Sequence, residues 1–87
     1  MPEISRFMGI KIFMYQSEKH QPHFHAEYAE FSGLIEIESR QQIEGDLPVR
    51  ILRVLTEWAV QHEAELIENW KLMRRDDVPN KIDPYRR

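Results

Sequence analysis

The spacing of apolar residues changes near residue 45, and this change divides the chain into two halves. Over residues 1–44 apolar and polar positions mostly alternate, which is typical of strands with one buried face. After residues 45–48 the apolar spacing becomes three and four, which is typical of an amphipathic helix. The pattern predicts a single domain over residues 1–87, mainly β over 1–44, helical over 46–75, and ending in an extended tail over 76–87.

The first half contains the segments that we expect to form strands. Residues 10–15, 23–28 and 33–38 have the alternation and composition of strands, and residues 4–7 are a candidate for a short strand before them, with a bend at Gly9. We interpret residues 40–44 as a connector or a short edge strand. A chain of 87 residues buries a thin core. We therefore expect an α+β fold: a small antiparallel sheet of three to four strands, followed by a C-terminal helical half packed on one face.

The two strands over residues 23–38 are close enough in sequence to form a hairpin. With residues 29–30 at its tip, Phe24 pairs with Ile35 and His23 pairs with Glu36. This register places apolar beside apolar and an imidazole beside a carboxylate. The alanine at position 29 does not favour the backbone conformation of a two-residue turn, and a wider loop would shift the pairing.

A long apolar stripe marks the helical half. Asp46 or Leu47 is expected to cap the helix, with Pro48 in its first turn, where a missing N–H costs nothing. One straight helix would outrun so small a sheet, so we favour a bend near residues 61–62, which gives one bent helix or two helices. The stripe consists of Leu52, Leu55, Ala59, His62, Leu66, Trp70 and Met73.

Composition restricts the chemistry available to the chain. It has no cysteine, which excludes disulfides, thiolate zinc sites and cysteine nucleophiles. No apolar run approaches the roughly 18 residues of a membrane span. Its first residues do not have the pattern of a signal peptide. We expect a cytoplasmic protein with no membrane contact.

The net charge of −3 is unevenly distributed along the sequence. Residues 1–70 carry 6 Lys/Arg and 12 Asp/Glu, whereas residues 71–87 carry 6 Lys/Arg and 3 Asp. An acidic body argues against a broad nucleic-acid surface, so nucleic acid is a weakly supported partner. The basic tail is suited to a phosphate or an acidic partner, but the simpler interpretation is that water surrounds it.

A cluster of histidines is the most unusual local feature. His20, His23 and His25 fall within six residues, and the last two share one face of a strand. Glu36 is expected on the neighbouring strand. Imidazoles with a carboxylate suit a divalent metal such as zinc, nickel or iron. The alternative is a structural role, in which these histidines bond to carbonyl groups or to Glu36.

The same histidines also suit acid–base chemistry without a metal. Imidazole titrates near neutral pH, so a metal-independent ribonuclease is a third hypothesis. Such an enzyme needs a cation to hold the phosphate, and Arg6, Lys11 or Arg40 would supply it. Nothing in the spacing of these residues requires this activity.

Trp58, Trp70 and His62 lie on the helical half. The tryptophans are interpreted as core or interface anchors, and a patch that contains them would contact a partner. His62 is expected at the edge of the core with a satisfied nitrogen.

Several segments resemble a bacterial family catalogued as domain of unknown function 4160. The likeness runs over nearly the whole chain and is most specific at Pro-His-Phe-His-Ala. Gln21 stands where members usually have a second proline, and residues 29–30 replace their usual Gly or Asn-Asp tip. The matching segments are residues 2–7 with Gly9, 22–28, 47–48, 57–59, 68–70 and 81–84.

The resemblance implies a context rather than a chemical activity. Members look like small proteins encoded beside another small protein, and some are classed as toxin–antitoxin components. The function we expect first is therefore a protein-interaction module of a toxin–antitoxin-type pair, with a partner encoded nearby. Metal binding and ribonuclease activity are the alternatives, and homo-oligomerisation is left open.

Overall fold

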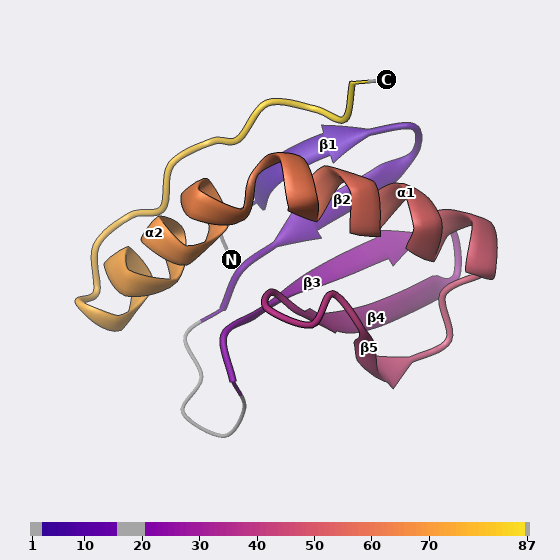
Figure 1. Ribbon diagram of the computed structural model, residues 1–87, viewed down its shortest axis with the longest axis horizontal. Helices are drawn as coiled ribbons and strands as arrows, with labels where there is room; N and C mark the ends of the chain where they lie inside the picture. Colours follow the sequence, from indigo (N-terminus) through magenta and orange to yellow (C-terminus); the bar gives the residue numbers. More distant parts are fainter. Residues whose placement is uncertain (1–2, 16–20, 87) are drawn as a thin grey trace.

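The computed structural model describes residues 3–15 and 21–86, and it is an antiparallel sheet covered on one face by two helices. The five strands are hydrogen-bonded in chain order (Figure 1). They are β1 (Glu3–Phe7), β2 (Ile10–Phe13), β3 (His23–Tyr28), β4 (Phe31–Glu36) and β5 (Gln42–Gly45). The prediction of an α+β fold is confirmed, but three to four strands were too few. β5 is largely exposed, so no apolar alternation marked it.

The hairpin of β3 and β4 has the predicted register. Phe24 lies opposite Ile35 and His23 opposite Glu36, with the two turn residues between Tyr28 and Phe31. The alanine in that turn has a φ of 53°, which is uncommon for a residue with a side chain. The pairing of apolar residues therefore fixes the register although the turn sequence does not favour it.

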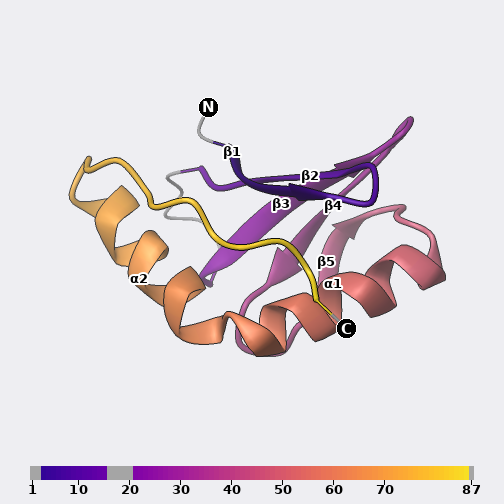
Figure 2. The ribbon, with the colours of Figure 1, turned by 90° about the horizontal axis from the view of Figure 1, so that it is seen from above.

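The helical half is two helices with a bend at the expected place. α1 (Val49–Gln61) and α2 (Glu63–Arg74) meet at His62, and both lie on the same face of the sheet (Figure 2). The N-cap is Pro48, rather than Asp46 or Leu47, and no side chain caps this end. None of the helices in the described residues is long and apolar enough to cross a membrane.

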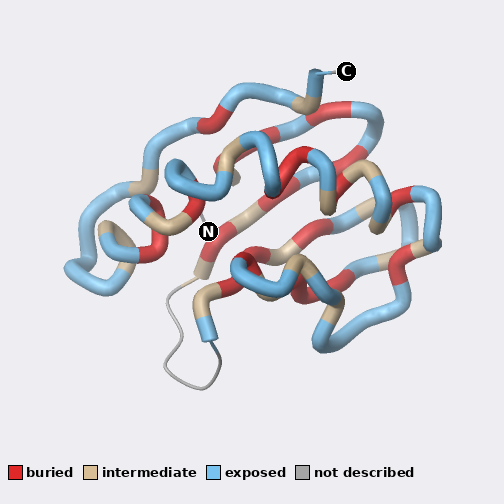
Figure 3. Tube along the Cα trace, viewed as in Figure 1, coloured by how far each residue is buried: buried red, intermediate tan, exposed pale blue. Residues whose placement is uncertain are grey.

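The core lies between the helices and the sheet, where buried positions of both layers face each other (Figure 3). Trp58 is fully buried at its centre. Its ring centroid lies 5.6 Å from that of Phe7 and 5.6 Å from that of Phe24. Trp70 is also buried, with 5% of its surface exposed. Both tryptophans therefore stabilise the chain's own core.

The C-terminal tail does not extend into water as the simpler interpretation of its charge suggested. It turns back after α2 and runs along the seam between the helices and β1 (Figures 1 and 2). Ile82 is buried, and its N–H donates to the carbonyl oxygen of Ile4 at 2.8 Å. Ile82 and Tyr85 pack against the core, and hydrogen bonds add to this docking, a pattern too sparse to show in the sequence.

Gly9 and Gly45 both have a positive φ, but the space beside their Cα atoms differs. A Cβ on Gly45 would lie 2.3 Å from the Ser32 carbonyl oxygen at a φ of +114°, whereas one on Gly9 would lie 3.6 Å from Tyr28 at a φ of +78°. We expect Gly45→Ala to lower the free energy of unfolding by more than about 2 kcal/mol, and Gly9→Ala by about 1 kcal/mol. Urea denaturation measures both, and equal losses would contradict this account.

Candidate functional site on the open face of the sheet

The face of the sheet opposite the helices carries a strip of apolar and aromatic side chains. Phe13, His25 and Leu34 are opposite one another on β2, β3 and β4, so their side chains share this face. Leu34 is buried but lies outside the core cluster. Tyr15 follows Phe13 on the same side of the alternation. We call these four residues the aromatic strip, because three of them carry rings.

The rings form a continuous row that leads from the open face to α2. The centroid of Tyr15 lies 6.3 Å from that of Phe13 and 4.3 Å from that of His25, and the His25 contact is edge-on at 87°. His25 lies 5.5 Å from His23, and His23 lies 5.0 Å from Trp70. Each ring is therefore held in place by its neighbours. Binding a partner would then cost these side chains little additional conformational entropy.

His23 is the buried end of the histidine pair, with 1% of its surface exposed. Its Nδ1 lies 2.8 Å from the carbonyl oxygen of Gln21. A carbonyl oxygen only accepts hydrogen bonds, so Nδ1 donates, and in the neutral ring Nε2 carries the lone pair. This arrangement satisfies the structural interpretation of His23. It is also the orientation that metal-binding histidines commonly adopt.

The structure places three of the four residues proposed as metal ligands on the adjacent strands β3 and β4. His23 and His25 are neighbours, and Glu36 is opposite His23 on β4. His20 lies outside the described residues. Within residues 3–15 and 21–86, no three His, Asp or Glu side chains are grouped so as to hold a metal ion. The metal site therefore remains a hypothesis that requires a ligand from outside this part of the chain.

The charged groups around the strip are mainly acidic. A shallow hollow of about 270 Å³ lies over β3, β4 and β5, with Glu27 and Glu44 among its lining residues. Lys11 is opposite Glu27 on β2. Arg6 forms an ion pair with Glu3, with 2.6 Å between Nε and Oε1. This balance argues against a polyanion as the ligand of this face.

The cations proposed for phosphate binding mostly have acidic partners. Arg6 is bound to Glu3, and Arg40 donates to the carboxylate of Glu63. Lys11 is on the open face but opposite Glu27. The structure therefore does not place a dedicated phosphate-binding cation beside the histidines within the described residues.

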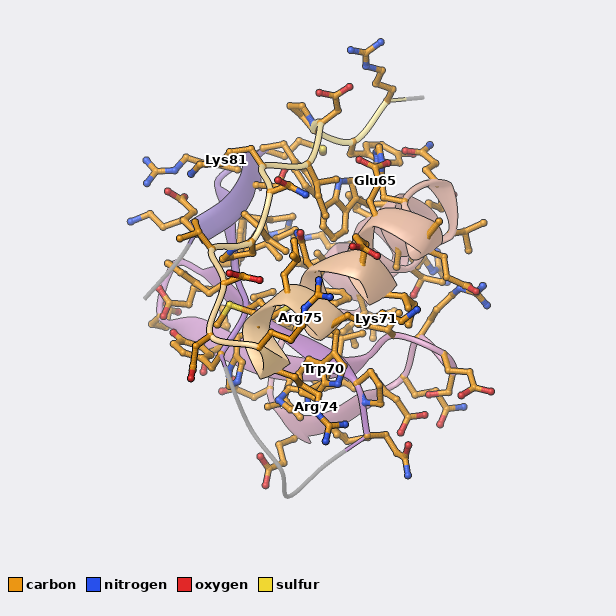
Figure 4. All side chains as sticks on the ribbon, turned by 90° about the vertical axis from the view of Figure 1, so that its left-hand side faces the viewer. Glu65, Trp70, Lys71, Arg74, Arg75 and Lys81 are labelled. Atoms are coloured by element: carbon orange, nitrogen blue, oxygen red, sulfur yellow. The ribbon has the colours of Figure 1, made fainter. Side chains whose placement is uncertain are left out.

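Four basic residues of the C-terminal part lie along one end of the molecule (Figure 4): Lys71, Arg74, Arg75 and Lys81. Lys71 and Arg74 are in the last turn of α2, where cations are favoured by the helix dipole. Arg75 lies 3.8 Å from Asp77, and Lys81 donates to the carbonyl oxygen of Glu3 at 2.7 Å. These contacts give the cations structural roles.

The remaining candidates lie in or beside the core. Trp58 donates through Nε1 to the carbonyl oxygen of Asp83 at 2.9 Å. The burial of Trp58 and Trp70 counts against their proposed contact with a partner. His62 has its Nδ1 2.6 Å from a Glu65 oxygen and its ring 5.6 Å from Trp58, as expected for a histidine at the core edge.

The sequence interpretation missed Phe13 and Tyr15 as members of a surface. Their alternation with Ile12 and Met14 already placed them on the polar side of the strand. Aromatic residues on the polar side of a half-buried strand are the signal that would have identified them.

Comparison with known proteins identifies one family. A family model described as Domain of unknown function (DUF4160) matches residues 9–71. No curated protein and no solved structure matches the chain.

The Tyr15 hydroxyl provides a test of the strip's geometry. Burial, and secondly the charge of Glu27, raise the pKa of Tyr15 above its usual value of about 10. Above pH 10 the unfolded chain therefore loses this proton more readily than the folded chain, and the free energy of unfolding falls as the pH rises. We expect Tyr15→Phe, which keeps the ring, to show a shallower fall between pH 9 and pH 11 in urea denaturation. Equal slopes would contradict the assignment.

Proposed function

The chain belongs to the DUF4160 family, and from the open face of its sheet we propose that it is a protein-interaction module. The aromatic strip carries this proposal. Aromatic residues are enriched at protein interfaces, with charged and polar groups at the rim. The strip has this arrangement, because Lys11, Glu27 and Glu44 are its neighbours on the same face.

The strip is suited to binding for two physical reasons. Its rings contact one another edge-on or in stacked geometry, so they lose little conformational freedom when a partner covers them. Aromatic rings also contribute more energy per residue at interfaces than most other side chains. The helices and the tail, as far as they are described, pack on the opposite face (Figure 2).

The charges of the face favour a partner that carries Lys or Arg. Glu27, Glu36 and Glu44 outnumber Lys11 there, and Arg6 is already paired with Glu3. Cations also interact favourably with the faces of aromatic rings. The partner we propose is a small protein encoded by a neighbouring gene, in a toxin–antitoxin-type pair, as the family resemblance suggests.

The interaction is tested by co-expression with the neighbouring gene product and calorimetry of the purified pair. We expect the double variant Phe13→Ala/His25→Ala to raise Kd at least about tenfold, or about 1.4 kcal/mol, because it removes two rings of the strip.

The control is Val60→Ala, which truncates an apolar residue exposed on α1 on the other side of the molecule. It should leave Kd unchanged. Thermal melts of both variants exclude unfolding as the cause. Equal weakening by the two variants, or unchanged binding by the double variant, would refute the proposed surface.

Metal binding is the second candidate, and the contact between His23 Nδ1 and the Gln21 carbonyl favours it. Metal-binding histidines commonly donate their other ring N–H to a carbonyl oxygen, as His23 does, and the further ligands of such a site would be His25, His20 and Glu36. The ribonuclease hypothesis has less support, because Arg6 and Arg40 are already paired with carboxylates.

Native mass spectrometry with added zinc, nickel or ferrous iron tests this candidate. We expect one ion per wild-type chain and none in His23→Ala/His25→Ala, with His62→Ala retaining the ion as the matched control. At a metal concentration 100 times Kd, the wild type should gain about 2.7 kcal/mol of stability. The metal-binding proposal would be refuted if the wild type bound no ion, or if His62→Ala lost the ion as well.

A further inference from the structure

The tail is bound to the rest of the chain largely through its own backbone. Asn69 makes two hydrogen bonds of 2.8 Å with Asn80: its amide nitrogen donates to the Asn80 carbonyl, and its oxygen accepts from the Asn80 N–H. Ile82 donates its N–H to Ile4, and Asp83 accepts at its carbonyl from Trp58. These contacts do not depend on the side chains of the tail.

Backbone recognition of this kind is how proteins bind extended peptides. An Asn side chain that pairs with both the N–H and the C=O of one residue imitates a neighbouring strand. The tail runs between the edge of β1 and the helices α1 and α2 (Figures 1 and 2), and we call the surface that it covers the tail groove. Ile82 is its buried apolar anchor, and Tyr85 adds a ring contact with Phe7 at 6.3 Å.

Shallow surface hollows lie beside the tail on the helical side. A hollow of about 240 Å³ lies between α2 and the tail, where Asn69, Asn80 and Ile82 are among its lining residues. A second, of about 420 Å³, lies between α1 and Tyr85.

The connection between α2 and the tail is a strained turn. The N–H of Asp76 donates to Met73 and that of Asp77 to Leu72, which reverses the chain direction. Asp76 has a φ of 59°, a conformation that is unfavourable for most residues with a Cβ. Val78, which follows, is 82% exposed. Extending this turn would relieve the strain and would expose little apolar surface that is now buried.

We propose that the groove is a binding site for an extended peptide segment, and that the tail of a second copy of this chain fills it in trans. The second copy supplies the same Ile82 anchor and the same backbone, so exchange preserves every contact of the docked tail. Short strained hinges favour such exchange between identical chains. This site lies on the helical side and is independent of the open face.

Two complementary full-length variants test the exchange. Ile82→Asp spoils the tail but keeps the groove, whereas Asn69→Ala weakens the groove but keeps the tail. Each variant alone should be monomeric by native mass spectrometry. Mixed at concentrations on the order of 0.1 mM, they should form a one-to-one complex, because the intact tail enters the intact groove. Circular dichroism verifies that both are folded, and folded variants that form no complex would overturn the proposal.

A labelled peptide gives an independent measurement if Asn69→Ala does not fold. The docked tail experiences an effective concentration on the order of 1 mM, so a tail docked more than about 90% of the time requires a Kd below about 0.1 mM. A peptide of residues 77–86 should therefore bind Ile82→Asp in fluorescence anisotropy with that affinity, and bind wild type at least tenfold more weakly. Ile82→Ala replaces Ile82→Asp if the charge disturbs folding. If the peptide binds but the two variants form no complex, the occupant is not a second copy of the chain. If the peptide does not bind, the groove is not a peptide-binding site.

Discussion

The buried indole of Trp58 joins the three parts of this fold. Its ring packs against Phe7 of β1 and Phe24 of β3, and its N–H holds the tail at Asp83. A chain of 87 residues has a thin core, and this one large side chain contacts both the sheet and the tail. Because Trp58 is buried in the core, it cannot also contact a partner, and any partner must bind elsewhere on the surface.

Much of the fold could be predicted because the spacing of apolar residues along the sequence is regular in most strands and in the helical half. The pairing of β3 with β4 followed from apolar alternation alone, and the bend at His62 followed from the length of the apolar stripe. β5 was not predicted with certainty because it is exposed and carries no alternation. The docked tail was missed because one isoleucine and several backbone hydrogen bonds leave no periodic signal.

The candidate site was predicted only in part, for a related reason. The sequence placed His23 beside His25 and opposite Glu36, and the structure has this arrangement. The burial of His23 against Trp70 could not be predicted, because it depends on where α2 passes the end of the sheet. The two surfaces that emerged, the aromatic strip and the tail groove, both combine segments from different elements, which local patterns do not reveal.

The docked tail also limits how the sheet itself can grow. In an antiparallel sheet the two outermost strands present backbone groups that template further strands, and open-ended stacking needs both of them. Here the carbonyl oxygens of Glu3 and Ile4 on β1 are occupied by Lys81 and Ile82, and β5 is the remaining outer strand. The chain's own C-terminal segment therefore covers part of one outer edge of the sheet and reduces the backbone that this edge presents to an added strand.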